Sequence, residues 1–287
     1  MSGLYFYWGA AEVDDLKLRY GIDSELTGAF VVDPPGAIAN DEIFVIEMIS
    51  ERPGLASETL ATINSKSWPY TQRFEYNVGQ QVRWRWINAT NEPHALHLHG
   101  FYYRIDAFNR GGQVQNYVGK SRPTVVTQRI AQGETFDMSW SPERPGRWLF
   151  HCHMLLHMMP PIVPGLSGLS VRPARAYANG HAAMHEPSGL GQLVLGITVP
   201  GNGEVAFDPK WHADRKLRLE ISERNGAPRY ALHLRDDVQG TDMPKETGLI
   251  GPPIVLVRGQ PVEIEVLNRL KDPTAIHWHG IELESYY

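Results

Sequence analysis

The side chains best suited to transition-metal chemistry lie in three short segments of this 287-residue chain. Residues 94–100 read HALHLHG, residues 151–157 read HCHMLLH, and residues 277–280 read HWHG. Imidazole and thiolate groups are ligands of copper, zinc and iron, so this clustering indicates metal binding. The remaining histidines lack such spacing and are expected to be surface or loop residues: His181, His185, His212 and His233.

The ligands divide between two strand faces. In a β-strand, residues two apart share a face and neighbours point to opposite faces. His97 and His99 therefore share one face, and His94 takes the other. Cys152 likewise points away from its two histidine neighbours. Combining the strands gives an inward group and an outward group: His94, Cys152 and His157 inward, and His97, His99, His151 and His153 outward.

The two groups differ in the chemistry that they can support. Two imidazoles and one thiolate form the trigonal ligand set of a blue-copper site, whereas imidazoles alone suit copper that must bind oxygen. His277 and His279 add two same-face imidazoles from the next domain, so we expect the outward group at a domain interface. A structural zinc site is the alternative, but it uses one closed set of four ligands, which the clustered residues exceed.

The elements that position these ligands are predicted to be strands. Turn signals at residues 33–36, 52–54 and 144–146 separate β-branched or alternating runs such as residues 81–87. Amphipathic helices are few, and the best candidate is a short piece from Glu12 to Arg19. The pattern predicts an all-β protein made of β-sandwich domains.

Two stretches repeat each other in outline. Residues 78–84 lead through a strand and an Asn-containing bend to the histidines at 94–99, and residues 257–264 lead similarly to those at 277 and 279. Such self-similarity predicts duplicated domains. We expect three parts: the last strands of a preceding domain, or an N-terminal extension, over residues 1–37; a complete domain over 38–199; and a further domain over 200–287 that stops after the HWHG strand.

Composition narrows the class of protein. A content of 42% hydrophobic and 21% charged residues is typical of a globular chain with a buried core. The net charge of -5 includes no basic block, and no apolar run approaches the roughly 20 residues that span a membrane. We therefore expect a small-molecule partner, no nucleic acid and no membrane. The single cysteine excludes an internal disulfide and leaves the redox compartment open.

The three segments resemble the copper-binding motifs of the multicopper oxidases, the family of laccases, bilirubin oxidases and copper efflux oxidases. Residues 94–100 look like HPxHLHG with Ala95 in place of proline, residues 148–157 look like WLFHCHxxxH, and residues 277–280 match HWHG. The resemblance implies cupredoxin-like Greek-key β-sandwich domains, with copper as the cofactor.

The resemblance also implies a role for each ligand. By motif position, His94, Cys152 and His157 would bind a type 1 copper that takes electrons from a small reductant. His97 and His277 would bind a type 2 copper. A binuclear type 3 pair would be bound by His99, His151, His153 and His279. Cys152 with its neighbours His151 and His153 would form the catalytic electron path, and up to four coppers would reduce dioxygen to water.

This sequence departs from the family pattern at the fourth motif. The family carries an H-x-H pair after a phrase like GTYWY, but here residues 3–7 read GLYFY and Trp8, Gly9 and Ala10 follow. Six of the eight imidazoles of a trinuclear cluster are therefore present. We expect the missing pair to come from a missing domain or from another chain of a homo-oligomer.

A second departure concerns the axial position of the type 1 copper. Ile162, Leu166 and Leu190 compete for it. We favour Leu190, because residues 191–197 make the better closing strand and residues 158–188 then form an insertion. Met158 and Met159 are either weak ligands or loop-packing residues, and we favour packing.

The resulting prediction is a laccase-like oxidase that takes single electrons from phenols or similar reductants and reduces dioxygen. A copper nitrite reductase is one rival, and residues 277–280 argue against it. A copper-binding electron-transfer protein without oxidase activity is another, which the absent H-x-H pair favours. Family resemblance suggests a periplasmic or secreted location, which the residues themselves do not indicate.

Overall fold

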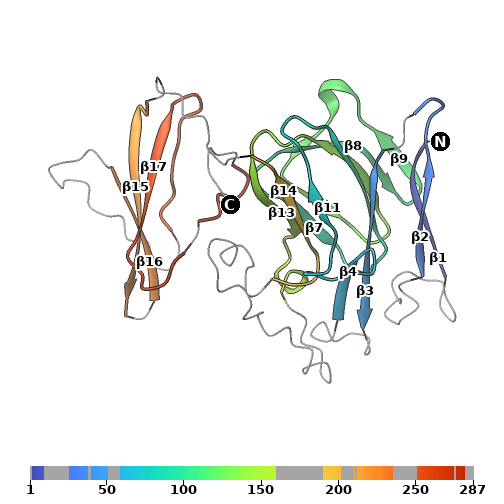
Figure 1. The fold of residues 1–287 in the computed structure, drawn as a ribbon, viewed down its shortest axis with the longest axis horizontal. Helices are drawn as coiled ribbons and strands as arrows, with labels where there is room; N and C mark the ends of the chain where they lie inside the picture. Colours follow the sequence, from blue (N-terminus) through green and yellow to red (C-terminus); the bar gives the residue numbers. More distant parts are fainter. Residues whose placement is uncertain are drawn as a thin grey trace. The chain divides into compact units, whose positions relative to one another are not determined.

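The computed structural model describes residues 2–9, 26–37, 40–50, 59–159, 190–201, 210, 212–225, 227–234, 251–274 and 276–281. In these ranges the regular elements are strands and two short 3-10 helices, which confirms the all-β prediction (Figure 1). The expected helix between Glu12 and Arg19 and the turn at 52–54 lie outside the described residues. No helix in the described ranges has the length and apolar character to cross a membrane.

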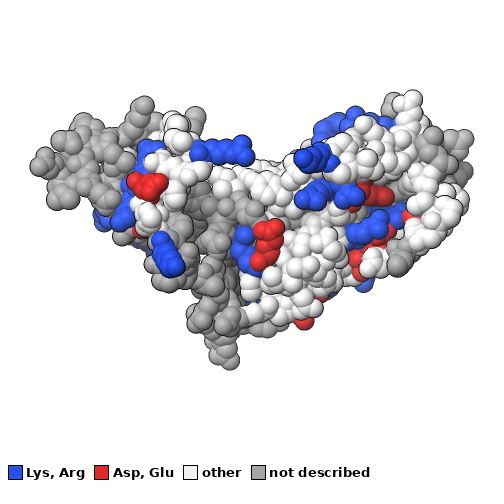
Figure 2. All heavy atoms as spheres, turned by 90° about the horizontal axis from the view of Figure 1, so that it is seen from above, with Lys and Arg blue, Asp and Glu red and all other residues white. Residues whose placement is uncertain are grey.

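The chain divides into two compact units. The first comprises Met1–Val205 and Trp278–Tyr287, and the second comprises Ala206–His277. The boundaries predicted after residues 37 and 199 stay predictions. On the face drawn in Figure 2, basic and acidic side chains of the described residues lie in several separate groups.

The first unit is a sandwich of two sheets. One sheet has the order β10-β8-β12-β6-β3-β4, with β9 beside β8, and the other has the order β11-β7-β13-β14-β5. The strands of the first sheet are β3 (Glu42–Ser50), β4 (Thr59–Ile63), β6 (Val82–Asn88), β8 (Tyr103–Arg110), β9 (Gln113–Asn116), β10 (Thr124–Val125) and β12 (Thr135–Trp140). Those of the second are β5 (Arg73–Glu75), β7 (His94–Leu98), β11 (Thr127–Ile130), β13 (Gly146–Cys152) and β14 (Val194–Val199).

Smaller elements flank this sandwich. Strands β1 (Gly3–Trp8) and β2 (Thr27–Val32) form an antiparallel pair, so the strand character expected for both segments is confirmed. The 3-10 helices are η4 (Gly119–Ser121) and η5 (Leu155–His157). Strand β14 pairs with β13 from Gly146↔Val199 to His151↔Val194, so the strand predicted over residues 191–197 is present from Val194 onward and lies between β13 and β5.

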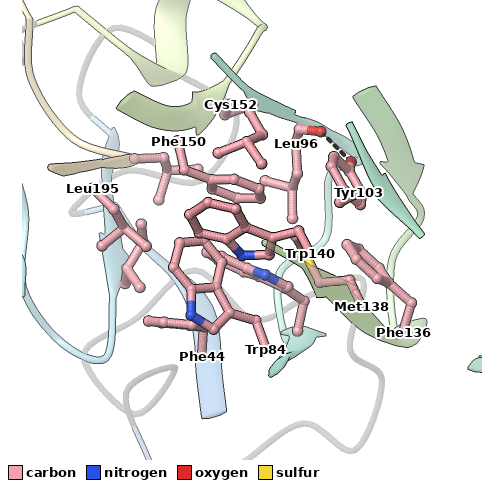
Figure 3. Close-up of a cluster of buried hydrophobic side chains, with 14 of the residues drawn as sticks. Phe44, Trp84, Leu96, Tyr103, Phe136, Met138, Trp140, Phe150, Cys152 and Leu195 are labelled. Atoms are coloured by element: carbon pink, nitrogen blue, oxygen red, sulfur yellow. Dashed lines mark hydrogen bonds between the residues drawn. The ribbon is translucent and has the colours of Figure 1, made fainter. Parts of the chain in front are cut away.

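An aromatic core fills the space between the two sheets. Trp86 stacks on Phe150 with ring centroids 4.8 Å apart, and Trp84 meets Phe150 edge-on at 5.1 Å. Figure 3 shows Cys152 at the margin of this cluster, beside Phe150 and Leu96. Alternation along β7 and β13 explains the arrangement, because every second residue of each strand faces this core. Burial of these large rings makes the sandwich a rigid support for the ligands at its edge.

The second unit contains a three-stranded sheet of order β16-β15-β17. Its strands are β15 (Arg215–Arg224), β16 (Ala227–Leu234) and β17 (Val262–Asn268). β16 is antiparallel to β15, whereas β17 is parallel to it. In the first unit β4 is antiparallel to β3 and β6 is parallel to β3, so the two units share this local topology.

Candidate metal centre

The register of β7 against β13 brings the two histidine segments together. His151 lies opposite His97, Cys152 opposite Leu96, and Phe150 opposite Leu98. Opposite residues in a sheet point to the same face. Cys152 and Leu96 therefore face the core, while His97 and His151 face away from it, as the alternation predicted.

The inward group forms a compact set of three donors. The Cys152 Sγ lies 3.7 Å from His94 Nδ1 and 3.6 Å from His157 Nδ1, and the two Nδ1 atoms are 3.1 Å apart. His94 and Cys152 are fully buried, and His157 is 5% exposed. His157 comes from η5, whose turn returns the chain toward Cys152. Two imidazole nitrogens and a thiol sulfur around one point fit a copper ion of the blue type.

Burial keeps these groups uncharged. It lowers the pKa of His94 well below 6.5, and the neighbouring His157 lowers it further. Burial also lowers the pKa of His157, although the Glu92 carboxylate opposes that shift. The pKa of the Cys152 thiol is raised by burial, against the backbone N–H groups of Met154 and Ala95. Neutral imidazoles keep a lone pair for a metal, and metal binding would displace the thiol proton.

The outward group forms a second array of imidazoles. His99 Nε2 and His151 Nε2 are 2.9 Å apart. The ring centroid of His97 lies 5.0 Å from that of His99 and 5.5 Å from that of His153. His97 directs Nδ1 to the Val126 carbonyl at 2.8 Å, and His151 directs Nδ1 to the Cys152 carbonyl at 2.9 Å. Because a carbonyl only accepts, both rings hold their proton on Nδ1 and present Nε2 as a ligand.

His279 joins this array within the first unit. Its ring centroid lies 4.2 Å from that of His97 and 4.6 Å from that of His153. Burial and the neighbouring His153 lower the pKa of His279. The Tyr102 hydroxyl donates to the Gly280 carbonyl at 3.0 Å, which fixes the adjacent backbone. Five of the predicted outward imidazoles are therefore gathered on one side of the sandwich.

Three other predicted residues have a different standing. His277 belongs to the second compact unit, so its place at the outward group stays a prediction. Leu190 is half-buried at the start of the closing segment, and its axial role stays a prediction as well. The rival axial residues, Ile162 and Leu166, lie outside the described residues. Among the remaining histidines, His212 is exposed, while His181 and His185 are outside the described ranges.

Three residues that contact the inward group or support the turn beside it were missed in the sequence. Glu92 Oε2 lies 3.2 Å from His157 Nε2, and Thr90 Oγ1 lies 2.9 Å from His94 Nε2. Gln192 donates from Nε2 to the carbonyls of Leu156 and Met159, both at 2.7 Å, and so holds the turn that carries His157. The nearness of Thr90 and Glu92 to His94 in sequence was a usable signal. Gln192 gave none, because its contacts are long-range.

A pocket of about 320 Å³ opens beside the inward group. The pocket is lined mainly by apolar side chains: Met48, Met154, Leu155 and Leu156. Its other described lining residues are Gln192, His157 and Glu92, and the last two also lie at the inward group. Its volume is at the lower end of small-molecule sites. The pocket therefore offers a small, largely apolar approach to the His157 imidazole.

Comparisons with known protein families agree with these features. A family model described as multicopper oxidase matches residues 45–162, and a second model with the same description matches residues 237–286. The first match contains both histidine strands of the sandwich, and the second contains the HWHG segment.

Individual relatives are distant and longer. Laccase-2 of Fomitopsis schrenkii is 25% identical over 148 residues, which are 51% of this chain and 26% of that protein. Laccase-4 of Trametes villosa is 32% identical over 71 residues, 25% of this chain and 13% of that protein. The chain thus aligns with about a quarter or less of these relatives. The solved structure of the multicopper oxidase mgLAC has a TM-score of 0.50 at 19% identity, covering 73% of this chain and 59% of that one, which supports the fold alone.

Proposed function

Because the chain belongs to the multicopper oxidase family, with cupredoxin-like sandwich architecture, we propose that it is a laccase-like oxidase. In this proposal it takes single electrons from phenolic or similar small reductants and passes them to dioxygen, which is reduced to water. The observation that carries the proposal is the position of Cys152. Its side chain lies in the inward donor group, and its backbone neighbours are histidines of the outward group.

The roles of the ligands follow from this arrangement. His94, Cys152 and His157 would hold a type 1 copper, with Leu190 at the axial position. Copper bound to these two groups of residues would supply one-electron redox chemistry and oxygen activation. Cys152 joins the inward donors through a few covalent bonds to His151 and His153, which is a short path for electrons. His97, His99 and His279 would supply further ligands on the oxygen-binding side. His277 is proposed there from its place in the motif alone.

The pocket beside His157 is the proposed entry for the reductant. Its lining is apolar, so a phenol ring can displace water there. The buried His157 ring spans the distance between the pocket and the Cys152 Sγ, which lies 3.6 Å from its Nδ1. An electron from a bound ring therefore needs to cross only one imidazole to reach the inward group.

The chain carries six of the eight imidazoles that a trinuclear cluster uses, which leads to a specific test. Fully copper-loaded protein should be measured for its ratio of copper to chain and for oxygen uptake with a phenol. A ratio near four with oxygen uptake supports the oxidase, with the missing ligands coming from another chain or domain. A ratio near one with no uptake would replace it with a copper-binding electron-transfer protein.

The variant Cys152→Ser provides the internal control for this experiment. It removes the single thiolate of the chain but keeps a side chain of similar size. We expect the blue colour and phenol oxidation to disappear while the circular dichroism spectrum is retained. Persistence of the blue colour would overturn the assignment of the inward group.

A further inference from the structure

One short segment contacts the outer nitrogen of both inward imidazoles. This segment, the Asn88–His94 loop, connects the end of β6 to the start of β7. Thr90 Oγ1 lies 2.9 Å from His94 Nε2, and Glu92 Oε2 lies 3.2 Å from His157 Nε2. His94 belongs to β7 and His157 to η5, yet the groups that hold the two imidazoles are two residues apart.

The partners of Thr90 decide where the proton of His94 lies. The Thr90 hydroxyl is 2.7 Å from Asn88 Oδ1 and 3.0 Å from the Glu92 carbonyl, and both of these oxygens can only accept. A hydroxyl has one hydrogen, and these acceptors take it. Its contact with His94 must then be one in which His94 Nε2–H donates. His94 therefore holds its proton on Nε2 and has a lone pair on Nδ1.

The same reasoning applies more directly to His157. A carboxylate only accepts hydrogen bonds, so the contact with Glu92 requires a proton on His157 Nε2. A neutral imidazole carries one proton, and this contact places it on Nε2. Its Nδ1 is consequently a lone pair as well.

Two lone pairs then face each other across the inward group. The His94 and His157 Nδ1 atoms are 3.1 Å apart with no proton between them, and both lie within 3.7 Å of Cys152 Sγ. Such a contact is repulsive unless a cation lies between the atoms. The loop thus holds the two rings in the tautomer and orientation that a metal requires.

The Asn88–His94 loop is itself held in place. Asn88 Nδ2 donates to the Glu92 carbonyl at 2.8 Å, and Asn88 Oδ1 accepts from the Thr90 backbone N–H at 3.0 Å. The Ala89 N–H donates to the Ile46 carbonyl of β3 at 3.0 Å. Asn88 and Thr90 are buried, so these bonds are shielded from water. The side chains of Thr90 and Glu92 are therefore fixed relative to both sheets.

We propose that Thr90 and Glu92 are positioning residues, which fix the tautomers and ring orientations of His94 and His157 and so preform the copper site at Cys152. The inference rests on the proposed role of these three residues as copper ligands. It assigns to one loop a function that neither the ligand motifs nor the family comparison gives. Outer partners of metal-bound histidines typically contribute 10–100-fold to metal affinity.

Four single variants of the 287-residue chain test the proposal, with copper(II) as the probe. Thr90→Val removes the hydroxyl at nearly constant size, and Thr90→Ser restores it. Glu92→Ala removes the acceptor, and Glu92→Gln keeps an acceptor oxygen without the charge. We expect Thr90→Val and Glu92→Ala to bind copper(II) about 10–100-fold more weakly and to broaden the electron paramagnetic resonance signal of the blue site. Thr90→Ser should retain the parent affinity and signal. Glu92→Gln should retain the parent signal and lose less copper(II) affinity than Glu92→Ala, because it keeps the acceptor oxygen and loses only the charge.

A charge effect separates positioning from a merely structural role. Glu92→Gln should raise the reduction potential of the blue site, because it removes a negative charge that favours the oxidised metal. Asp272→Asn is the matched control: it removes one carboxylate at the corresponding place in the second unit and should change neither affinity nor potential. Parent affinity and signal in both Thr90→Val and Glu92→Ala would overturn the proposal.

The outcome can be separated from that of the proposed oxidase. Copper affinity and the spectroscopic signal report on the Cys152 site whether or not dioxygen is consumed, so a parent protein without oxygen uptake leaves this test intact. If metal-free Thr90→Val fails to fold by circular dichroism, the Glu92 pair carries the test. The side chain of Glu92 is 35% exposed, so its replacement leaves the core intact.

Discussion

Two stretches of the molecule, residues 79–100 and 259–280, have the same local course but different chemistry. Gly79 and Gly259 adopt nearly equal left-handed conformations, with φ of 80° and 83°. After each turn comes a strand that pairs in parallel with an earlier one, β6 with β3 and β17 with β15. The sequence similarity between the stretches thus reflects a shared backbone frame.

The bend after each strand is also shared. Asn88 Oδ1 accepts from the backbone N–H two residues later, and its Nδ2 donates to the carbonyl four residues later. Asn268 makes the same two bonds, at 2.9 Å to each partner. Asparagine suits this position because its amide can donate and accept at once. The bend is therefore a feature of the fold and not of the metal site.

The side chains on this frame differ where the inward group lies. At constant spacing, Thr90 corresponds to Leu270 and His94 corresponds to Thr274, whereas His97 and His99 correspond to His277 and His279. The second stretch keeps the outward pair and lacks the inward ligand together with its hydroxyl partner. The proposed type 1 copper site thus uses side chains that the second stretch, with a similar backbone course, does not carry.

The largest expected effect comes from removing this difference. His94→Thr places in the first stretch the residue that Thr274 provides in the second. Because the inward group then has one imidazole in place of two, we expect the blue colour to be lost. Phenol oxidation should fall by more than the roughly 10–100-fold that follows loss of an outer-shell partner. The reciprocal Thr274→His should create no second blue site, because the chain has no cysteine besides Cys152. Visible absorption and oxygen uptake measure both, and a blue His94→Thr protein would contradict the comparison.

Burial of the two corresponding strands gives the next effect. Trp86 of β6 is fully buried and stacks on Phe44 at 4.4 Å, whereas Val266 at the corresponding place in β17 is 40% exposed. Trp86→Ala should lower the free energy of unfolding by about 3–5 kcal/mol. Val266→Ala should lower it by less than about 1 kcal/mol. Urea denaturation of both variants checks this, and equal losses would mean that the two sheets are supported in the same way.

Charged residues at corresponding positions sharpen the contrast further. Arg85 of β6 is buried and forms ion pairs with Asp33 at 2.6 Å and with Asp41. Glu265 of β17 pairs with Arg218 at 2.6 Å, but both side chains are more than a third exposed. Arg85→Met should cost roughly 3 kcal/mol, because it removes the buried cation that Asp33 and Asp41 share. Glu265→Gln should cost less than about 1 kcal/mol. Thermal unfolding gives both values, and a Glu265 effect as large as that of Arg85 would contradict the burial argument.

The smallest effect is a pH dependence of the charge cluster in the first unit. Burial raises the pKa of Asp137 to about 6, against the lowering effect of Arg85. The folded state therefore prefers the protonated acid, so this contribution to stability is complete below about pH 4 and is lost as the pH rises through 6. We expect the advantage of Asp137→Asn over the parent to grow by on the order of 2 kcal/mol across this interval. If the free energies of unfolding of the two proteins change in parallel from pH 4 to 7, Asp137 is not responsible for the pH dependence of stability.

Much of the candidate site was predictable because its logic is local. Alternation of side chains along a strand predicted His94 and Cys152 on one face and His97, His99 and His151 on the other, and in the structure Cys152 lies opposite Leu96 and His151 opposite His97. The all-β class and the duplicated frame were equally visible in turn residues and in repeated segments. Each of these features is set by residues that lie close together in the sequence, so it can be predicted without knowledge of the fold.

What the sequence by itself determined was the identity of the donors and the face on which each lies, since a strand repeats every two residues whatever surrounds it. Only the tertiary structure decided how those donors are held. Glu92 reaches His157 across 65 positions of sequence, and Gln192 reaches Ala61 across 131. Such contacts depend on which loops the two packed sheets bring together, and no local pattern records that. The tautomers of the two inward imidazoles, and with them the readiness of the site for copper, therefore follow from the fold.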